Sequence, residues 1–125
     1  MLRTARYGTC DLDKARSFYD AVTALLGGKR VLDMENLSGY QGPSGGMFVI
    51  GKPLQGEPSV GNGTQMVFEA PSCSAVDAAH AKALELRGKC EGPPGFRGPA
   101  ELNFYAAYFR DHESNKLVVV KQGPE

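Results

Sequence analysis

A strand-like segment near the end of the chain carries a tyrosine that could take part in chemistry. Alternation along "LNFYAAYFR" puts every second side chain on one face: Phe104, Ala106, Tyr108 and Arg110. If Tyr108 points inward, its phenol could donate a hydrogen bond to a ligand oxygen or act as a weak acid. The alternative is a tyrosine that packs in a wall below a helix, and the sequence leaves both open.

Two charged side chains, Arg6 and Glu69, could also contact a bound ligand. Period-two alternation puts Arg6 on the face of Thr4, and it puts Glu69 on the face of Gln65 and Val67. An inward arginine would favour a ligand that carries a carboxylate or a phosphate. The alternatives are a structural ion pair between Arg6 and Glu69, or solvated charges at a cavity mouth.

The histidines and cysteines do not form a recognisable site. His80 falls on a helix-like segment, where packing is its commonest role, and His112 falls in a turn, where we expect it to be solvated. Cys10, Cys73 and Cys90 are an odd number without C-x-x-C spacing, which argues against a disulfide framework or a zinc knuckle. We expect three reduced cysteines that fill the core.

The first half of the chain predicts a strand, a helix and further strands. Residues 2–9 have strand character, and Asp11 is a candidate N-cap for a helix over 12–26. Gly27 and Gly28 follow as helix-ending glycines. The segments "KRVLDME" and "GMFVIGK" predict two strands, and the residues between them allow a third.

The second half repeats this order at an offset of about sixty residues. "TQMVFEA" predicts a strand, a helix over 74–87 follows, and "LNFYAAYFR" and "NKLVVVK" predict the closing strands. With this offset, Thr4 of the first repeat corresponds to Thr64 of the second, and Gly28 corresponds to Gly88. An internal repeat of this kind constrains the architecture more strongly than any single segment does.

The repeat predicts an α+β fold of two βαβββ modules in one domain. We place module one at 1–51, a Gly- and Pro-rich linker at 52–63 and module two at 64–125. Neither module is long enough to bury a good core alone, so we expect the two to form one curved mixed β-sheet around a cavity, with the helices outside. Small ligands bind in concave surfaces of this kind.

Composition excludes several classes of partner. Fourteen basic and fourteen acidic residues cancel, so no net positive field would attract nucleic acid or anionic lipid. No apolar stretch is long enough to cross a bilayer, and "MLRTARYG" has arginines where a signal peptide needs an apolar core. We therefore expect a cytoplasmic protein without nucleic-acid or membrane partners.

Three motifs, taken in order, resemble those of one protein superfamily. They are the opening "YGTCDLDKARSFYDAV", the central "GNGTQMVFEAPSCSAVDAAHAKAL" and the closing "FYAAYFRDHESNKLVVV". With the repeat, they resemble the glyoxalase/bleomycin-resistance/extradiol-dioxygenase superfamily, also called the vicinal oxygen chelate group, over essentially the whole chain. In that superfamily, His and carboxylate side chains at four inward strand positions hold one divalent metal ion. The resemblance also places Tyr108 where ring-cleaving members have a tyrosine beside their substrate.

The four metal positions of the superfamily fall on unsuitable residues here. By the resemblance, they correspond to Thr4, seven residues before the "DL" helix start; Val49, on the strand of "GPSGGMFV"; Gln65, after "GNGT"; and Val118, after "NKL". Valine offers no donor atom, and Thr and Gln are poor neutral ligands for a transition metal. We therefore expect no metal ion, no other cofactor and no metal-dependent activity.

The resemblance also implies a lid and an assembly. The loop "CEGPPGFRGPAE" matches one that closes over an end of the cavity, where Phe96 could stack on a ligand and Arg97 could pair with an anion. An ordinary surface loop is the alternative. Members of this length usually pair, so we expect a homodimer.

Three functions are compatible with these observations. We favour a metal-free protein that binds a small organic molecule in the sheet cavity. The alternatives are a lyase or isomerase of lactoylglutathione-lyase type, with Tyr108 as acid–base, and a non-catalytic assembly module, so whether the protein is an enzyme stays open. The expected ligand-binding residues are Thr4, Arg6, Val49, Gln65, Val67, Glu69, Phe96, Arg97, Tyr108 and Val118.

Overall fold

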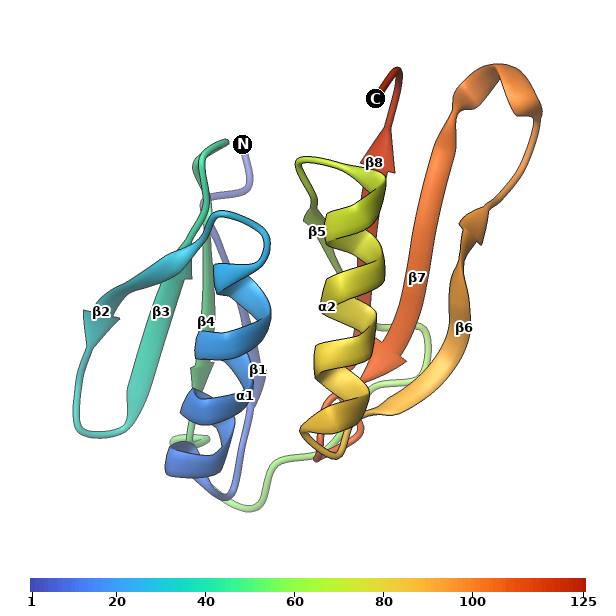
Figure 1. Ribbon diagram of the computed structural model, residues 1–125. Coiled ribbons are helices and arrows are strands. Elements are labelled where there is room, and N and C mark those ends of the chain that lie inside the picture. Colours follow the sequence, from blue (N-terminus) through green and yellow to red (C-terminus); the bar gives the residue numbers. More distant parts are fainter.

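The chain folds into two modules with the same order of elements. The computed structural model describes all residues from Met1 to Glu125 (Figure 1). Module one contains β1 (Thr4–Gly8), α1 (Leu12–Ala24), β2 (Lys29–Asp33), β3 (Leu37–Gln41) and β4 (Met47–Gly51). Module two contains β5 (Met66–Glu69), α2 (Cys73–Glu85), β6 (Lys89–Phe96), the short 3-10 helix η1 (Ala100–Leu102), β7 (Phe104–Arg110) and β8 (Lys116–Gln122). The predicted α+β fold of two βαβββ modules is confirmed.

Each module forms its own four-stranded mixed sheet. The strand orders are β1-β4-β3-β2 and β5-β8-β7-β6, with the first strand of each module parallel to the last. No hydrogen-bonded ladder joins the two sheets, so the expected single sheet is corrected to two. Side chains occupy the seam between them: the rings of Phe48 and Phe68 meet edge to face at 5.2 Å. Packed aromatic rings there hold the modules together without backbone pairing.

One hydrophobic core spans both modules. Helices α1 and α2 lie side by side and pack against each other, each covering the sheet of its own module (Figure 1). Phe18 of α1 lies 6.4 Å from the ring of Phe109 on β7, and Tyr19 lies 4.8 Å from the ring of Phe48. Because side chains of each module complete the core of the other, we expect the two modules to fold as one unit.

The repeat extends to the way in which the helices end. The backbone N–H of Gly28 donates to the carbonyl of Thr23 at 2.8 Å, and that of Gly88 donates to Ala83 at 2.7 Å. Both bonds close a turn of the Schellman type, which satisfies carbonyls that the helix leaves free. The equivalence of Gly28 and Gly88 that the sequence predicted is therefore confirmed at the level of individual hydrogen bonds.

The turn between β7 and β8 fastens module two to module one. The carboxylate of Glu113 accepts hydrogen bonds from the Thr9 hydroxyl and from the backbone N–H of Cys10, just before α1 begins. Asp111 in the same turn is buried and accepts a hydrogen bond from the Tyr19 hydroxyl at 2.6 Å. These bonds join segments about one hundred residues apart in the chain and so hold the relative position of the modules.

The placement of His112 corrects the expectation that it is solvated. Its side chain is only 5% exposed, and its ring lies 6.0 Å from that of Phe18. The physical reason is that the turn folds back onto the start of α1, where Glu113 is held by hydrogen bonds.

Neither α1 nor α2 has the length and the apolar character that a helix needs to span a membrane.

Candidate functional site

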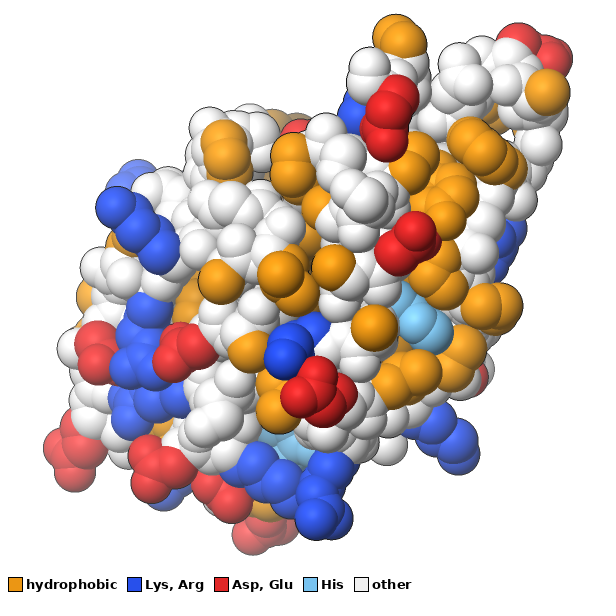
Figure 2. Space-filling view, in the orientation of Figure 1, with side chains coloured by type: hydrophobic (Ala, Val, Ile, Leu, Met, Phe, Trp, Pro, Cys, Tyr) orange, Lys and Arg blue, Asp and Glu red, His pale blue; other side chains and the backbone are white.

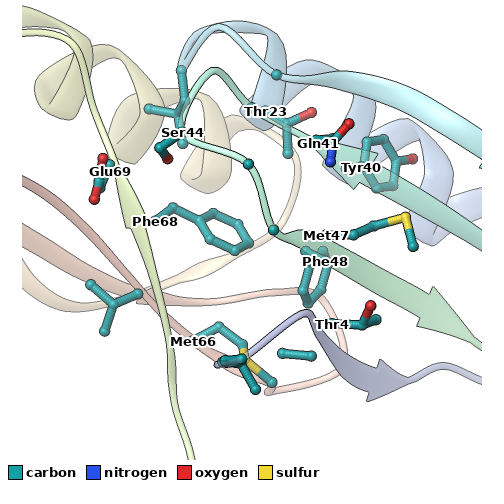
Figure 3. Close-up of a pocket in the computed structure, with 18 of the residues that line it drawn as sticks. Thr4, Thr23, Tyr40, Gln41, Ser44, Met47, Phe48, Met66, Phe68 and Glu69 are labelled. Carbon is teal, nitrogen blue, oxygen red and sulfur yellow. The ribbon is translucent and has the colours of Figure 1, made fainter.

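A cavity of about 460 Å³ lies in the seam between the two sheets (Figure 3). Its walls come from the starts of β1 and β4, from β5, from the end of α1 and from the turn that joins β3 to β4. Apolar side chains and polar side chains both reach it. The apolar members include Met47, Phe48, Met66 and Phe68, and the polar members include Thr4, Thr23, Gln41, Ser44, Gln65 and Glu69.

Strand alternation explains how β5 supplies two kinds of wall. Met66 and Phe68 are half-buried and turn toward the core, whereas Val67 and Glu69 are exposed. Alternate residues of a strand point to opposite sides, so one short strand contributes an aromatic surface and a charged rim. In Figure 3 the ring of Phe68 points toward Phe48, and Glu69 lies away from both rings, on the side of Ser44.

A glycine-rich turn keeps the cavity open on the side of module one. Gly45 and Gly46 have φ values of 83° and 70°, and a Cβ atom added to either would meet no atom within 4 Å. Glycine adopts this left-handed conformation without a steric cost. At these two positions the turn therefore borders the cavity with backbone alone, which leaves room for a ligand.

Four of the ten predicted ligand-binding residues line this cavity. They are Thr4 from β1, Gln65 from the segment before β5, and Val67 and Glu69 from β5 itself. Arg6 does not line it, because its guanidinium donates to the carbonyl of Lys52 at 2.6 Å. The ion pair between Arg6 and Glu69, one of the alternatives that the sequence left open, is not among the ion pairs of the structure.

The other predicted residues lie on the sheets, outside the cavity. Val118 is buried and pairs with Val67 on one side and with Tyr108 on the other, so these three form one row across the second sheet. The ring of Tyr108 has the guanidinium of Arg97 at 5.5 Å and the ammonium of Lys116 at 5.8 Å. Tyr108 is therefore flanked by two cations, and its row reaches the cavity only through Val67.

Phe96 and Val49 lie away from the cavity and away from each other. Phe96 is 67% exposed and meets the ring of Tyr105 edge to face at 5.0 Å. Val49 is buried in the first sheet, where it pairs with Arg6 of β1. Phe96 and Arg97 lie in the long arm of β6 and β7, which projects beyond the rest of the molecule (Figure 1).

The aromatic wall of the cavity was missed by the sequence analysis. Phe48 and Phe68 are adjacent in sequence to Val49 and Val67, so their side chains point to the opposite face of the same strands. For Phe48 the signal was present, because "MFVI" is apolar at consecutive positions and a strand of this kind is buried on both faces. For Phe68 the signal was alternation, because Met66 and Phe68 share the half-buried face of β5, opposite Val67.

The sequence and the structure of the chain were compared with those of known proteins. No protein-family model matches the chain, and no curated protein matches its sequence. A solved glyoxalase/bleomycin resistance protein from Albidiferax ferrireducens is 34% identical, with a TM-score of 0.86 over 96% of this chain and 97% of that chain. A glyoxalase-related enzyme from Fulvimarina pelagi is 12% identical, with a TM-score of 0.73 over 96% and 86% of the two chains. A lactoylglutathione lyase from Agrobacterium tumefaciens is 21% identical, with a TM-score of 0.65 over 96% and 92%.

Paired βαβββ modules with a cavity in the seam between their sheets define the class of protein, an α+β fold of the vicinal oxygen chelate type. Within that class, the chain belongs to the glyoxalase/bleomycin-resistance family, because it is 34% identical to a member over nearly its whole length. The resemblance drawn from the sequence is thereby confirmed. The two more distant structures show the shared fold alone.

The divalent metal ion of this superfamily does not fit the residues present. Val49 and Val118 are buried and have no donor atom, while Thr4 and Gln65 offer only neutral oxygens. Nowhere in the chain do three or more His, Cys, Asp or Glu side chains come together in a group that could hold a metal ion. The chemistry of the donor set therefore gives no basis for a step that passes through a bound metal.

Proposed function

We propose that this protein binds a small organic molecule in the seam cavity without a metal ion. The observation that carries the proposal is the cavity itself, whose volume of about 460 Å³ falls in the range usual for small-molecule sites. Its walls come from both modules, and four residues predicted from the sequence line it. Apolar walls with a few polar groups at the rim are the usual composition of such sites.

The lining favours a ligand with an apolar body and a hydrogen-bonding edge. The rings of Phe48 and Phe68 form an edge-to-face pair against which a flat apolar group can pack. At the rim, Gln65 can donate and accept hydrogen bonds, whereas Glu69 can only accept them when ionised. A hydroxyl or amino group on the ligand would therefore meet a suitable partner.

We propose further that two copies of the chain form a homodimer. Strands β1 and β5 each pair with a neighbour on one side only, and both border the cavity. Exposed apolar side chains lie next to them, with Leu2 78% and Val67 54% exposed. Natural proteins cover free strand edges, and a second copy would do so. A monomeric mass by light scattering at about 50 μM, a concentration far above the dissociation constant of a stable dimer, would refute this part of the proposal.

A thermal-shift screen tests the binding proposal. The panel contains aromatic compounds, thiol conjugates and antibiotics, and a ligand at ten times its Kd should raise the free energy of unfolding by about 1.4 kcal/mol. The variant Gln65→Trp places a large ring at the cavity and should abolish the shift. The matched variant Gln55→Trp changes an exposed linker residue outside the cavity and should retain it. The absence of a thermal shift with every compound of the panel, or equal shifts in the two variants, would contradict the assignment.

Acid–base catalysis by Tyr108 is not part of this proposal. The likeness to a lactoylglutathione lyase is 21% in sequence and is a likeness of fold, which does not transfer a reaction. Tyr108 also lies outside the residues that line the cavity. Turnover of a glutathione hemithioacetal that disappears in Tyr108→Phe would establish the lyase function in place of simple binding.

A further inference from the structure

A thiol–imidazole pair lies outside the seam cavity, between α2 and β6. The Nε2 atom of His80 and the Sγ atom of Cys90 are 3.2 Å apart. Cys90 is exposed, which corrects the expectation that it fills the core, and it sits on β6, the edge strand of its sheet. A nucleophile and a base within hydrogen-bond reach are the minimum arrangement for thiol chemistry.

The surroundings of His80 hold the imidazole in place and keep it neutral. Its side chain is largely buried and meets the ring of Phe109 edge to face at 6.2 Å. Burial lowers the pKa of His80, and the negative charge of Asp77 opposes this shift without cancelling it. A neutral imidazole has one nitrogen free to accept a proton, and Nε2 is the atom that faces the thiol.

The other two thiols have carboxylates beside them instead of an imidazole. A hydrogen bond with Glu113, together with its charge, raises the pKa of Cys10. Burial, followed by the charge of Glu125, raises the pKa of Cys73. Because the thiolate is the reactive form, both environments work against reaction. The three cysteines therefore provide an internal comparison within a single chain.

The surface around the pair can accept an apolar reagent. Hydrophobic side chains gather on the side of the molecule formed by α2, β6 and β7 (Figure 2). Leu84, one turn after His80 on α2, is 40% exposed. The apolar part of a disulfide reagent can therefore make contacts on this side of the molecule.

We propose that Cys90 is a modification site that reacts with low-molecular-weight disulfides, with His80 as its base. The proton of the Cys90 thiol passes to Nε2 of His80, and the sulfur attacks one sulfur of the disulfide. The new bond joins Cys90 to that half of the reagent, the original S–S bond breaks, and the leaving thiolate takes the proton back. The cysteine is oxidised and the other half of the disulfide is reduced, so no further reactant is needed.

Limited labelling of the whole native protein tests this proposal. Dithiodipyridine and oxidised glutathione are added separately in substoichiometric amounts, and peptide mapping by mass spectrometry locates the adducts. With both reagents, Cys90 should react at least about tenfold faster than Cys10 or Cys73. In protein unfolded by urea the three rates should become similar, since the advantage depends on the fold. Faster labelling of Cys10 or Cys73, or the same ratio in native and unfolded protein, would overturn the assignment.

Two variants of α2 separate the role of His80 from general effects on the helix. His80→Gln removes the base and should lower the rate at Cys90 about fivefold or more while the circular dichroism spectrum is retained. Lys82→Gln changes a residue of the same helix that does not contact Cys90 and should leave the rate unchanged. An unchanged rate in a folded His80→Gln protein would show that the imidazole is not the base.

Discussion

The buried hydrogen bond between Tyr19 and Asp111 allows a direct test of what fastens the two modules. The phenol of Tyr19 donates to Oδ2 of Asp111 at 2.6 Å, and both residues are almost fully buried. The substitution Tyr19→Phe keeps the ring and removes only the hydroxyl. The Oδ2 atom of Asp111 is then left with one partner, the side-chain amide of Asn115 at 3.0 Å.

The expected loss follows from the charge and the burial of the acceptor. A hydrogen bond to a charged group contributes about 1.5–3 kcal/mol, and no water can replace a donor lost in the core. We therefore expect Tyr19→Phe to lower the free energy of unfolding by about 2–3 kcal/mol. For a chain of this length that corresponds to a fall in Tm of roughly 6–15 °C.

The chain contains a matched control for this variant. The hydroxyl of Tyr105 donates to Asp77, also at 2.6 Å, but this pair is exposed to solvent. Water can take the place of the hydroxyl there, so Tyr105→Phe should cost at most about 0.5–1 kcal/mol. Urea unfolding followed by circular dichroism at neutral pH measures both values. Equal losses in the two variants, or a loss below about 1 kcal/mol for Tyr19→Phe, would refute the reasoning.

Three further predictions follow from other positions. A Cβ atom at Gly88 would lie 2.6 Å from the carbonyl oxygen of Ala83, so Gly88→Ala should cost about 2 kcal/mol or more; Gly42, with no atom within 4 Å, should accept alanine at no cost in the same urea titration. Burial acts to raise the pKa of Glu113, but the hydrogen bonds from Thr9 and Cys10 outweigh it, and the pKa lies below its ordinary value. Glu113→Gln should therefore destabilise the protein by about 1–2 kcal/mol near neutral pH, and the difference from wild type should shrink as the pH falls below about 4.5 through the lowered pKa; a pH-independent difference would contradict this. Elemental analysis of dialysed, untagged protein should find well under one equivalent of Zn, Ni, Fe or Mn per chain, and a stoichiometric metal ion would overturn the donor argument.

Much of the fold was predictable because its signals are local. Alternation and helical spacing act over a few residues, and the glycines that end both helices mark the same position in each module. The equivalence of Gly28 with Gly88 could thus be derived from spacing, and the structure reproduces it as two hydrogen bonds of nearly equal length. The family followed from the order of these local motifs.

The relation between the modules could not be predicted, because it depends on contacts between distant side chains. Nothing in the spacing of Phe48 and Phe68 indicates that their rings meet across the seam between the two sheets. His112 was expected in solvent because its neighbours form a turn, yet that turn is held against the start of α1. Cys10 and Cys90 were expected in the core from the average behaviour of cysteine, but both are exposed.

The way in which the last hairpin holds the first helix has a consequence for synthesis on the ribosome. Tyr19 and Asp111 are separated by 92 residues, so roughly 5–18 seconds pass between their appearance at usual rates of translation. During that time, the face of α1 that packs against β7 and the last turn lacks these partners. The core of the first module is therefore incomplete until the last hairpin has been made, and we expect a chaperone to have the most effect on yield in this interval.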